Sequence, residues 1–350
     1  MDGNWLLMSR FPIVNTRYVD DATVMQEVKT LMIKSINIVL KTFPSIDNII
    51  FVSDGGSWRK DLEIPQCVKD SAERSKVDSS TYKGNRKKDD EINWDLVFAE
   101  FNKFTEELRN AGISVFNEPG IEGDDWCWYW STTLNKRGTN VIIWTKDRDI
   151  TQLCSSDNNG CFTVVWNKQN GVFVKKDDDL TKFLLNPYFH ANEEILNDVV
   201  NRSVGKIEVI PEEIQIDKII RGDAGDNIFP IMTRPAKNGG ERLYRPTAKQ
   251  LPETLDIYSA DEVSNWIDSL LSTKQWAGRA NEDPGSILEH FNYNRKMVVL
   301  DERSYPENIL QAFHKYDNWM DEHPLCNNID KAEASILAQK NDIQSILDEI

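Results

Sequence analysis

Residues 140–153 read NVIIWTKDRDITQL, and this stretch gives the first indication of the fold. Residues 141–144 are apolar and mostly β-branched, which is typical of a strand buried on both faces of a sheet. Asp147 and Asp149 follow at its carboxyl end, where α/β sheets bind their ligands. A lone Asp-x-Asp is more often a turn former, but three other apolar segments of this chain also end in acidic residues. The stretch therefore predicts an α/β fold with an acidic site at one sheet edge.

The composition indicates a globular protein that needs no membrane. The chain has 350 residues, 40% of them hydrophobic, and a mean hydropathy of −0.52, which suits one large domain or two ordinary ones. Its apolar runs are short and no signal peptide is recognisable, so we expect a cytoplasmic protein, in the host cell if the chain is viral. The five cysteines are scattered, with no Cys-x-x-Cys pair, which fits a reducing compartment and argues against zinc.

Two further predicted strands are also followed by carboxylates. Residues 49–52 predict a strand that leads to Asp54 and a glycine turn. Residues 113–116 predict another, and the acidic residues Glu122, Asp124 and Asp125 follow it, ahead of a Trp-rich run. One or two acids at a helix start are favoured by the helix dipole, but three carboxylates in four residues repel one another unless a positive charge lies among them.

Other segments carry periodic patterns. Amphipathic helices are predicted over 24–43 and 94–108, and a β-hairpin over 161–175. An apolar-periodic segment, 214–220, ends just before Asp223 and Asp226. Near the start of the chain, Asp2 precedes an apolar stretch and, taken alone, would be a helix N-cap. Most of 260–350 is helical by pattern.

The net charge of −16 argues against nucleic acid as a partner unless cations are concentrated locally. Residues 58–88 contain nine Lys or Arg against five Asp or Glu, and a second basic stretch follows residue 233. Such an insertion is usually a solvated loop, but its place directly after Asp54 indicates a single-stranded nucleic-acid element instead. The candidate nucleic-acid contacts are Tyr82, Arg59, Lys60, Lys87, Arg242, Arg245 and Lys249.

Sheet topology would bring the acidic strand ends together along one edge. So many carboxylates would not all ionise without divalent cations, and an all-oxygen set suits two Mg²⁺ ions, for which Mn²⁺ can substitute. Two such ions about 3.5–4 Å apart form the arrangement that cleaves phosphodiesters. The full set is Asp2, Asp54, Glu122, Asp124, Asp125, Asp147, Asp149, Asp223 and Asp226.

Six motifs in this order resemble the flap endonuclease and 5′-3′ exonuclease family: DGNWLL, VSDGG followed by W-R, YKGNRKKDD, EGDD, TKDRDITQL and GDAGDN. The resemblance is strongest to the ribonuclease H branch of T-even bacteriophages and includes NRKMVVLDERSYPENI at 294–309. It implies a PIN-like α/β nuclease domain over 1–205, with a mostly parallel central sheet and a helical arch at about 55–93. A helical, duplex-binding helix-three-turn-helix domain would follow over 206–350.

The resemblance also implies roles for individual residues. Glu122, Asp124 and Asp147 would bind the first metal with Asp54 nearby, while Asp149, Asp223 and Asp226 would serve the second, directly or through water. Asp2 and Asp125 complete the set. Lys83 and Arg86 match the basic pair at the foot of the arch, which is expected to contact the scissile phosphate.

The implied activity is metal-dependent 5′-3′ exonuclease and flap endonuclease hydrolysis, which removes RNA primers and flaps in phage DNA replication. The expected substrates are DNA and RNA–DNA hybrids with a free 5′ end or flap. A replication single-strand-binding protein or clamp is the candidate protein partner, and we expect a monomer. Two alternatives remain: a PIN-type ribonuclease without 5′-end dependence, which the arch motif disfavours, and a non-catalytic nucleic-acid clamp, which the retained carboxylates disfavour.

The sequence departs from the family pattern in two places. After the Gly-Asp motif, residues 229–242 lack the usual Gly-rich hairpin, so the details of the duplex contact are open. Only Met1 precedes Asp2, where the family has an apolar strand. We therefore expect either a start upstream of Met1 or a loosely held Asp2 that contributes weakly.

Overall fold

The computed structural model describes residues 1–15, 21–43, 46, 48–86, 92–156, 161–167, 171–176, 208–236, 243–323 and 329–348. The chain forms two compact units. The first contains residues 1–56, 89–209 and 311–350, and the second contains residues 57–88 and 210–310. The expected domain boundary at 205/206 lies outside the described residues. The basic insertion after Asp54 packs with the second unit.

A mostly parallel set of strands organises the first unit. Strand β1 (Ile50–Val52) pairs in parallel with β2 (Ser114–Phe116), and β3 (Val141–Trp144) pairs in parallel with β5 (Phe162–Asn167). Met1 and Asp2 connect the two pairs, because Asp2 forms a parallel bridge with Val52 and donates its backbone N–H to the Trp144 carbonyl at 3.2 Å. The carboxyl ends of β1 and β3 therefore lie on either side of Asp2.

The rest of this sheet follows the expected hairpin. Strand β6 (Gly171–Lys175) runs antiparallel to β5, as predicted, and β4 (Ser155–Ser156) also pairs antiparallel with β5. Strand β7 (Glu208–Val209) pairs in parallel with β6.

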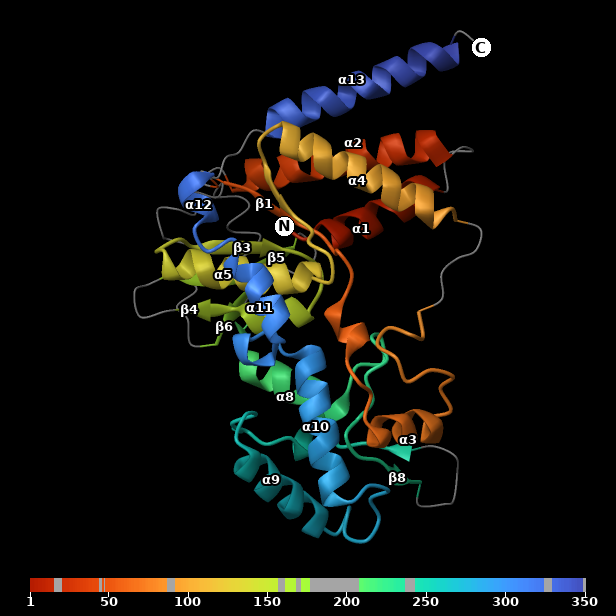
Figure 1. Ribbon diagram of the computed structural model, residues 1–350, viewed down its shortest axis with the longest axis vertical. Coiled ribbons are helices and arrows are strands. Elements are labelled where there is room, and N and C mark those ends of the chain that lie inside the picture. The colour runs from red at the N-terminus through yellow and green to blue at the C-terminus, as the bar shows by residue number, and fades with distance from the viewer. Residues whose placement is uncertain are drawn as a thin grey trace. The chain divides into compact units, whose positions relative to one another are not determined.

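Helices cover the sheet of the first unit. Helix α1 (Gly3–Asn15) packs on α2 (Asp21–Thr42), and α13 (Ile329–Asp348) lies across α2 and α4 (Trp94–Asn110) (Figure 1). Their apolar faces bury Leu6, Met32 and Phe104 completely, together with Phe51 from β1. Helix α5 (Gly123–Lys136) packs against β1, β3 and β5. The shorter elements are the 3₁₀ turn η2 (Asp149–Leu153) and helices α11 (Glu307–His314) and α12 (Trp319–Glu322).

The second unit is mainly helical, as predicted. Helix α10 (Pro284–Val298) packs against α3 (Gln66–Arg74), α8 (Pro211–Arg221) and α9 (Ala260–Ser272), around a core that includes Ile219 and Phe291 (Figure 1). The remaining elements are the pair β8 (Arg234–Pro235) and β9 (Leu243–Tyr244), and the 3₁₀ turns η1 (Trp58–Asp61), η3 (Ala248–Gln250) and η4 (Glu302–Ser304). In the described part of the chain, no helix is both long and apolar enough to cross a membrane.

Candidate metal and nucleic-acid sites

The start of helix α5 carries three of the predicted carboxylates. Glu122 is the N-cap residue, and the Asp125 carboxylate turns back to accept the Glu122 backbone N–H at 3.1 Å. Asp125 is fully buried at position N3, and its carboxylate completes a capping box with Glu122. Asp124 is only half-buried. The two adjacent aspartates therefore have different structural roles.

Asp54 is held against the same helix start. Its Oδ1 accepts the Gly123 N–H at 2.7 Å, and its Oδ2 accepts the Asn4 side-chain amide at 2.8 Å. The Asn4 amide oxygen in turn accepts the Asp54 backbone N–H at 3.0 Å. A Cβ on Gly123 would lie 3.2 Å from Asp54 Oδ1 and 3.9 Å from Asp2 Oδ1, so both carboxylates surround this glycine. A helix N-terminus favours negative charge at this position.

Asp2 is firmly held, so the expectation of a loose residue is wrong. Its side chain is 6% exposed, its Oδ1 accepts the Trp5 N–H at 2.9 Å as an N-cap of α1, and its Oδ2 accepts the Thr145 hydroxyl at 2.8 Å. Met1 and Asp2 also pair through their backbones with both neighbouring strands. Burial raises the pKa of Asp2, although both hydrogen bonds lower it.

The Thr145 hydroxyl connects Asp2 to the acidic turn after β3. It accepts the Asp147 backbone N–H at 3.1 Å while it donates to Asp2. The Asp147 carboxylate accepts the Asp149 N–H at 2.8 Å, which orders the turn that enters η2. Asp147 is exposed and Asp149 is half-buried. The sequence allowed two interpretations of Asp147 and Asp149, as turn-forming residues or as part of an acidic site. In the structure these aspartates order the turn and also lie beside the other carboxylates.

These carboxylates interact electrostatically at Asp124. Burial is the largest cause that raises the pKa of Asp124 well above its usual value, followed by the negative charges of Asp147, Asp2, Glu122 and Asp54. Among the described residues, the Asp124 carboxylate has no hydrogen-bond or ion-pair partner. Its environment therefore disfavours the ionised form until a cation approaches.

The donor set suits a hard divalent cation. All the predicted donors are carboxylate oxygens, and the described residues contain no His/Cys cluster that would form a zinc site. No three His, Cys, Asp or Glu side chains of the described residues lie close enough to enclose an ion by themselves. Mg²⁺ keeps several waters and commonly uses one or two carboxylates with substrate phosphates, so it does not require such a cage. The carboxylates present therefore fit a hard divalent cation.

The second unit holds Asp223 and Asp226 in a tight loop after α8. Gly222 has a φ of +69°, and Asp223 exchanges two backbone hydrogen bonds with Ile228, which closes the loop. The Asp223 carboxylate pairs with Lys218 and accepts the Gly225 N–H at 2.8 Å. Lys218 lowers the pKa of Asp223, against the effect of burial.

The predicted basic residues differ in their surroundings. Arg59 is 3% exposed, donates to the Met297 carbonyl at 2.9 Å and lies 4.6 Å over the Trp58 ring, so its structural role is to anchor η1. Lys60, Arg245 and Lys249 are exposed. The residues Lys87 and Arg242 lie outside the described part of the chain. Lys83, Arg86 and Tyr82 all contact the Asp226 segment.

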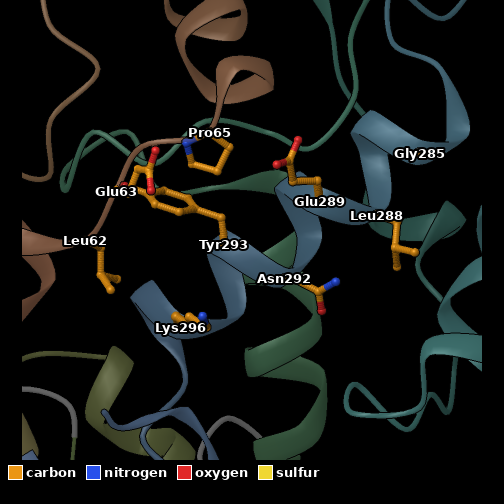
Figure 2. Close-up of a pocket in the computed structure, with 9 residues that line it drawn as sticks. All are labelled: Leu62, Glu63, Pro65, Gly285, Leu288, Glu289, Asn292, Tyr293 and Lys296. Carbon is orange, nitrogen blue, oxygen red and sulfur yellow. The ribbon is translucent and has the colours of Figure 1, made fainter. Parts of the chain in front are cut away.

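A hollow of about 680 Å³ in the second unit lies between residues 62–65 and one face of α10 (Figure 2). Leu288 and Pro65 are among its apolar residues, and Glu63, Glu289 and Lys296 are its charged ones. It contains none of the predicted site residues. The candidate chemistry therefore lies elsewhere.

Two residues of the site escaped prediction, Asn4 and Thr145. Both are polar residues that lie two positions from a predicted aspartate and hydrogen-bond carboxylates of the acidic set. Their only sequence signal is this proximity, because the partner of Asn4 is 50 residues away and that of Thr145 is 143 residues away.

Comparison with known proteins finds a partial match to one family. Residues 59–183 match the family described as 5′-3′ exonuclease, N-terminal resolvase-like domain. The 5′-3′ exonuclease of Buchnera aphidicola is 27% identical over 156 residues, which are 45% of this chain and 46% of that protein. The match thus spans about half the length of that relative.

The structural comparisons cover more of the chain. A bacteriophage T5 D15 flap endonuclease, in a pseudo-enzyme–product complex with DNA and metal ions, is 15% identical, with 92% of this chain and 97% of that chain covered and a TM-score of 0.51. The T5 D15 protein co-crystallised with metal ions is 17% identical, with 96% and 97% covered and a TM-score of 0.48. The first likeness supports the predicted PIN-like α/β core followed by a helical part.

Proposed function

We propose that the chain, whose residues 59–183 match the 5′-3′ exonuclease N-terminal domain family, is a divalent-metal-dependent 5′ nuclease that hydrolyses phosphodiester bonds. The observation that carries the proposal is the environment of Asp124. Its carboxylate is influenced by four others, from the Asp2 bridge, the ends of β1 and β3 and the N-cap of α5, and it has no cationic partner among the described residues. Such a cluster is costly to fold unless a bound cation offsets the repulsion.

The residues of the first unit divide into metal donors and supports. Glu122, Asp124 and Asp147 would hold the first ion, with Asp54 beside them. Bound Mg²⁺ ions would supply an activated water and stabilise the leaving oxygen. Thr145, Asn4 and the Gly123 N–H fix Asp2 and Asp54 through hydrogen bonds of 2.7–2.8 Å, so these carboxylates are oriented before any ion arrives.

The basic residues would hold and activate the polyanion. Lys83 and Arg86 would donate to the scissile phosphate, where negative charge increases in the transition state. The exposed Arg245 and Lys249 would contact the duplex backbone, which fixes register without taking part in the chemistry. Lys60 belongs to the same proposed surface, whereas the buried Arg59 and Tyr82 support it from within.

The proposed substrates are DNA and RNA–DNA hybrids with a free 5′ end or flap. Primer and flap removal in phage DNA replication, in the host cytoplasm, is the role that this activity would serve. A replication single-strand-binding protein or clamp is the proposed protein partner, and the proposed state is a monomer.

A 5′-labelled flap substrate tests the proposal. We expect short 5′ products in Mg²⁺, none in excess EDTA, and none from a substrate whose 5′ end is blocked by a bulky adduct. Cleavage of blocked, single-stranded RNA would favour a PIN-type ribonuclease instead. Tight binding without cleavage at any Mg²⁺ or Mn²⁺ concentration would favour the non-catalytic clamp and refute the nuclease.

A further inference from the structure

Strands β8 and β9 place a cationic and an aromatic side chain opposite each other in the second unit. Arg234 and Tyr244 are direct partners in the antiparallel register of this pair. The Arg234 guanidinium lies 5.1 Å from the centre of the Tyr244 ring and 5.5 Å from the centre of the Trp276 ring. Because Trp276 is buried, its ring anchors the arginine, which in turn holds the tyrosine. We call these three residues the Tyr244 cluster.

The tyrosine of this cluster lies at the surface. It is 43% exposed, and it is the one exposed large hydrophobic side chain among the described residues of the second unit. A single exposed aromatic residue is common in soluble proteins and needs no functional explanation. The Arg234 guanidinium, however, holds this ring in place, so that a ligand that covers the ring meets a preorganised surface.

The chain around the Tyr244 cluster is cationic, although the whole chain has a net charge of −16. Residues 234–236, 243–250 and 273–279 contain no Asp or Glu and five Lys or Arg, which are Arg234, Arg245, Lys249, Lys274 and Arg279. The Gln250 side-chain amide donates to the Gln275 side chain at 2.7 Å, which brings the exposed neighbours of these glutamines, Lys249 and Lys274, to one part of the surface. Such a local concentration of cations attracts a polyanion.

We propose that the Tyr244 cluster is a stacking site for an unpaired base of single-stranded DNA or RNA, and that the surrounding cations contact the phosphates of the strand. Every base has a π-face, so the site would accept any sequence, whereas an intact duplex presents such a face only at its ends. One base stacked on an aromatic side chain typically raises affinity by about 5- to 150-fold. This goes beyond the proposed nuclease, because the site binds unpaired nucleotides whether or not they are cleaved.

Binding to base-bearing and abasic strands tests the site without cleavage. The probes are a fluorescent single strand of about 12 thymidines and the same strand with abasic sites, which keeps the phosphates but removes the bases. By fluorescence anisotropy in EDTA, we expect wild type to bind the thymidine strand about fivefold or more tightly than the abasic strand. Tyr244→Ala should lose most of this preference, and Tyr244→Phe should keep it.

Lys274→Ala is the matched control, because it removes a charge without touching the cluster and should weaken both strands by the same factor. The proposal would be overturned if Tyr244→Ala also weakened both strands by the same factor, or if it weakened neither. Because the measurement involves no cleavage, these outcomes decide the stacking site even if wild type cuts no flap.

Arg234→Lys tests whether the guanidinium positions the ring. Lysine keeps the positive charge for the phosphates, but it lacks the planar group that lies against both aromatic rings. We expect this variant to bind the abasic strand as wild type does and to lose most of the preference for bases. The double variant with Tyr244→Ala should lose no more than Tyr244→Ala alone, because both changes act on one interaction. Losses that multiply would show that the two residues act separately and would overturn the proposed cluster.

Discussion

Asp124→Asn tests the acidic cluster through folding stability as well as through activity. The wild-type carboxyl has a raised pKa because burial and four neighbouring carboxylates disfavour its charge. A carboxyl whose pKa is higher in the folded than in the unfolded state lowers stability at pH values above both pKa values. Asparagine removes the charge at nearly constant volume, so the variant should be more stable than wild type in metal-free buffer at pH 8.

The expected gain follows from Coulomb repulsion. Two unit charges about 6 Å apart repel by about 3 kcal/mol at an effective dielectric of about 20. Because Asp54 and Asp147 are exposed to solvent, the repulsion is partly screened, and we expect a net gain of about 1–3 kcal/mol. The difference should shrink as the pH falls from the raised pKa toward about 4, since the wild-type carboxyl then becomes protonated in both states.

Urea denaturation at pH 8 and pH 5, in EDTA and in Mg²⁺, measures these effects. Mg²⁺ at about 100 times its dissociation constant should stabilise wild type by about 2.7 kcal/mol and the variant by much less. Asp125→Ala is the control at the neighbouring position, because it removes the helix cap and should cost about 1 kcal/mol in both buffers. The metal-cluster interpretation would be refuted if Asp124→Asn were less stable than wild type in EDTA, or if Mg²⁺ stabilised it as much as it stabilises wild type.

Four further predictions test separate parts of the structure. Burial lowers the pKa of His290 to about 3, so the free energy of unfolding should fall below pH 6.5 by up to about 1.4 kcal/mol per pH unit. In urea denaturation, His290→Asn should reduce this pH dependence, and an unchanged slope would contradict the prediction. Gly222→Ala should destabilise the protein by several kcal/mol, because its Cβ would lie 2.3 Å from the Ile228 carbonyl oxygen. Gly278→Ala has a similar φ of +62° but open space around its Cβ, so it should cost only about 1 kcal/mol. Equal losses of stability in thermal melts would argue against the steric cause. Thr145→Val removes two hydrogen bonds and should cost about 1–3 kcal/mol and most of the cleavage rate, and a fully active variant would rule out this positioning role. Arg245→Ala should weaken duplex binding and reduce its salt slope by about 1 with an unchanged saturated rate, which a loss of saturated rate would disprove.

The sequence alone determined the main elements of the first unit. The apolar run at 141–144 became β3 without a change of bounds, and the predicted helix at 94–108 became α4 over Trp94–Asn110. These predictions succeed because side-chain periodicity is a local property of the chain. The acidic residues after β1 and β3 follow strand ends that lie on either side of Asp2, as expected for parallel strands, whose carboxyl ends lie at one sheet edge.

Only the tertiary structure determined the role of each carboxylate. Asp124 and Asp125 are adjacent and chemically identical in the sequence, yet the first interacts with the other carboxylates and the second caps α5. The helix rotates successive side chains by about 100°, so neighbours point in different directions. Thr145 likewise could not be assigned from its neighbours, because its hydrogen-bond partner Asp2 is 143 residues away.

The basic insertion shows the same division between local and tertiary information. Its charge and its place after Asp54 were readable from the sequence and indicated a single-stranded nucleic-acid element, and the family resemblance implied an arch in the nuclease domain. The segment instead packs with α8 and α10 in the second unit, where Asp226 holds Arg86 and Asn227 holds the backbone at Ser79 and Thr81. Local patterns do not encode these pairs, because hydrogen bonds between residues about 140 positions apart depend on how the chain folds back on itself. The sequence thus determined which residues carry charge, and the tertiary structure determined which charges meet.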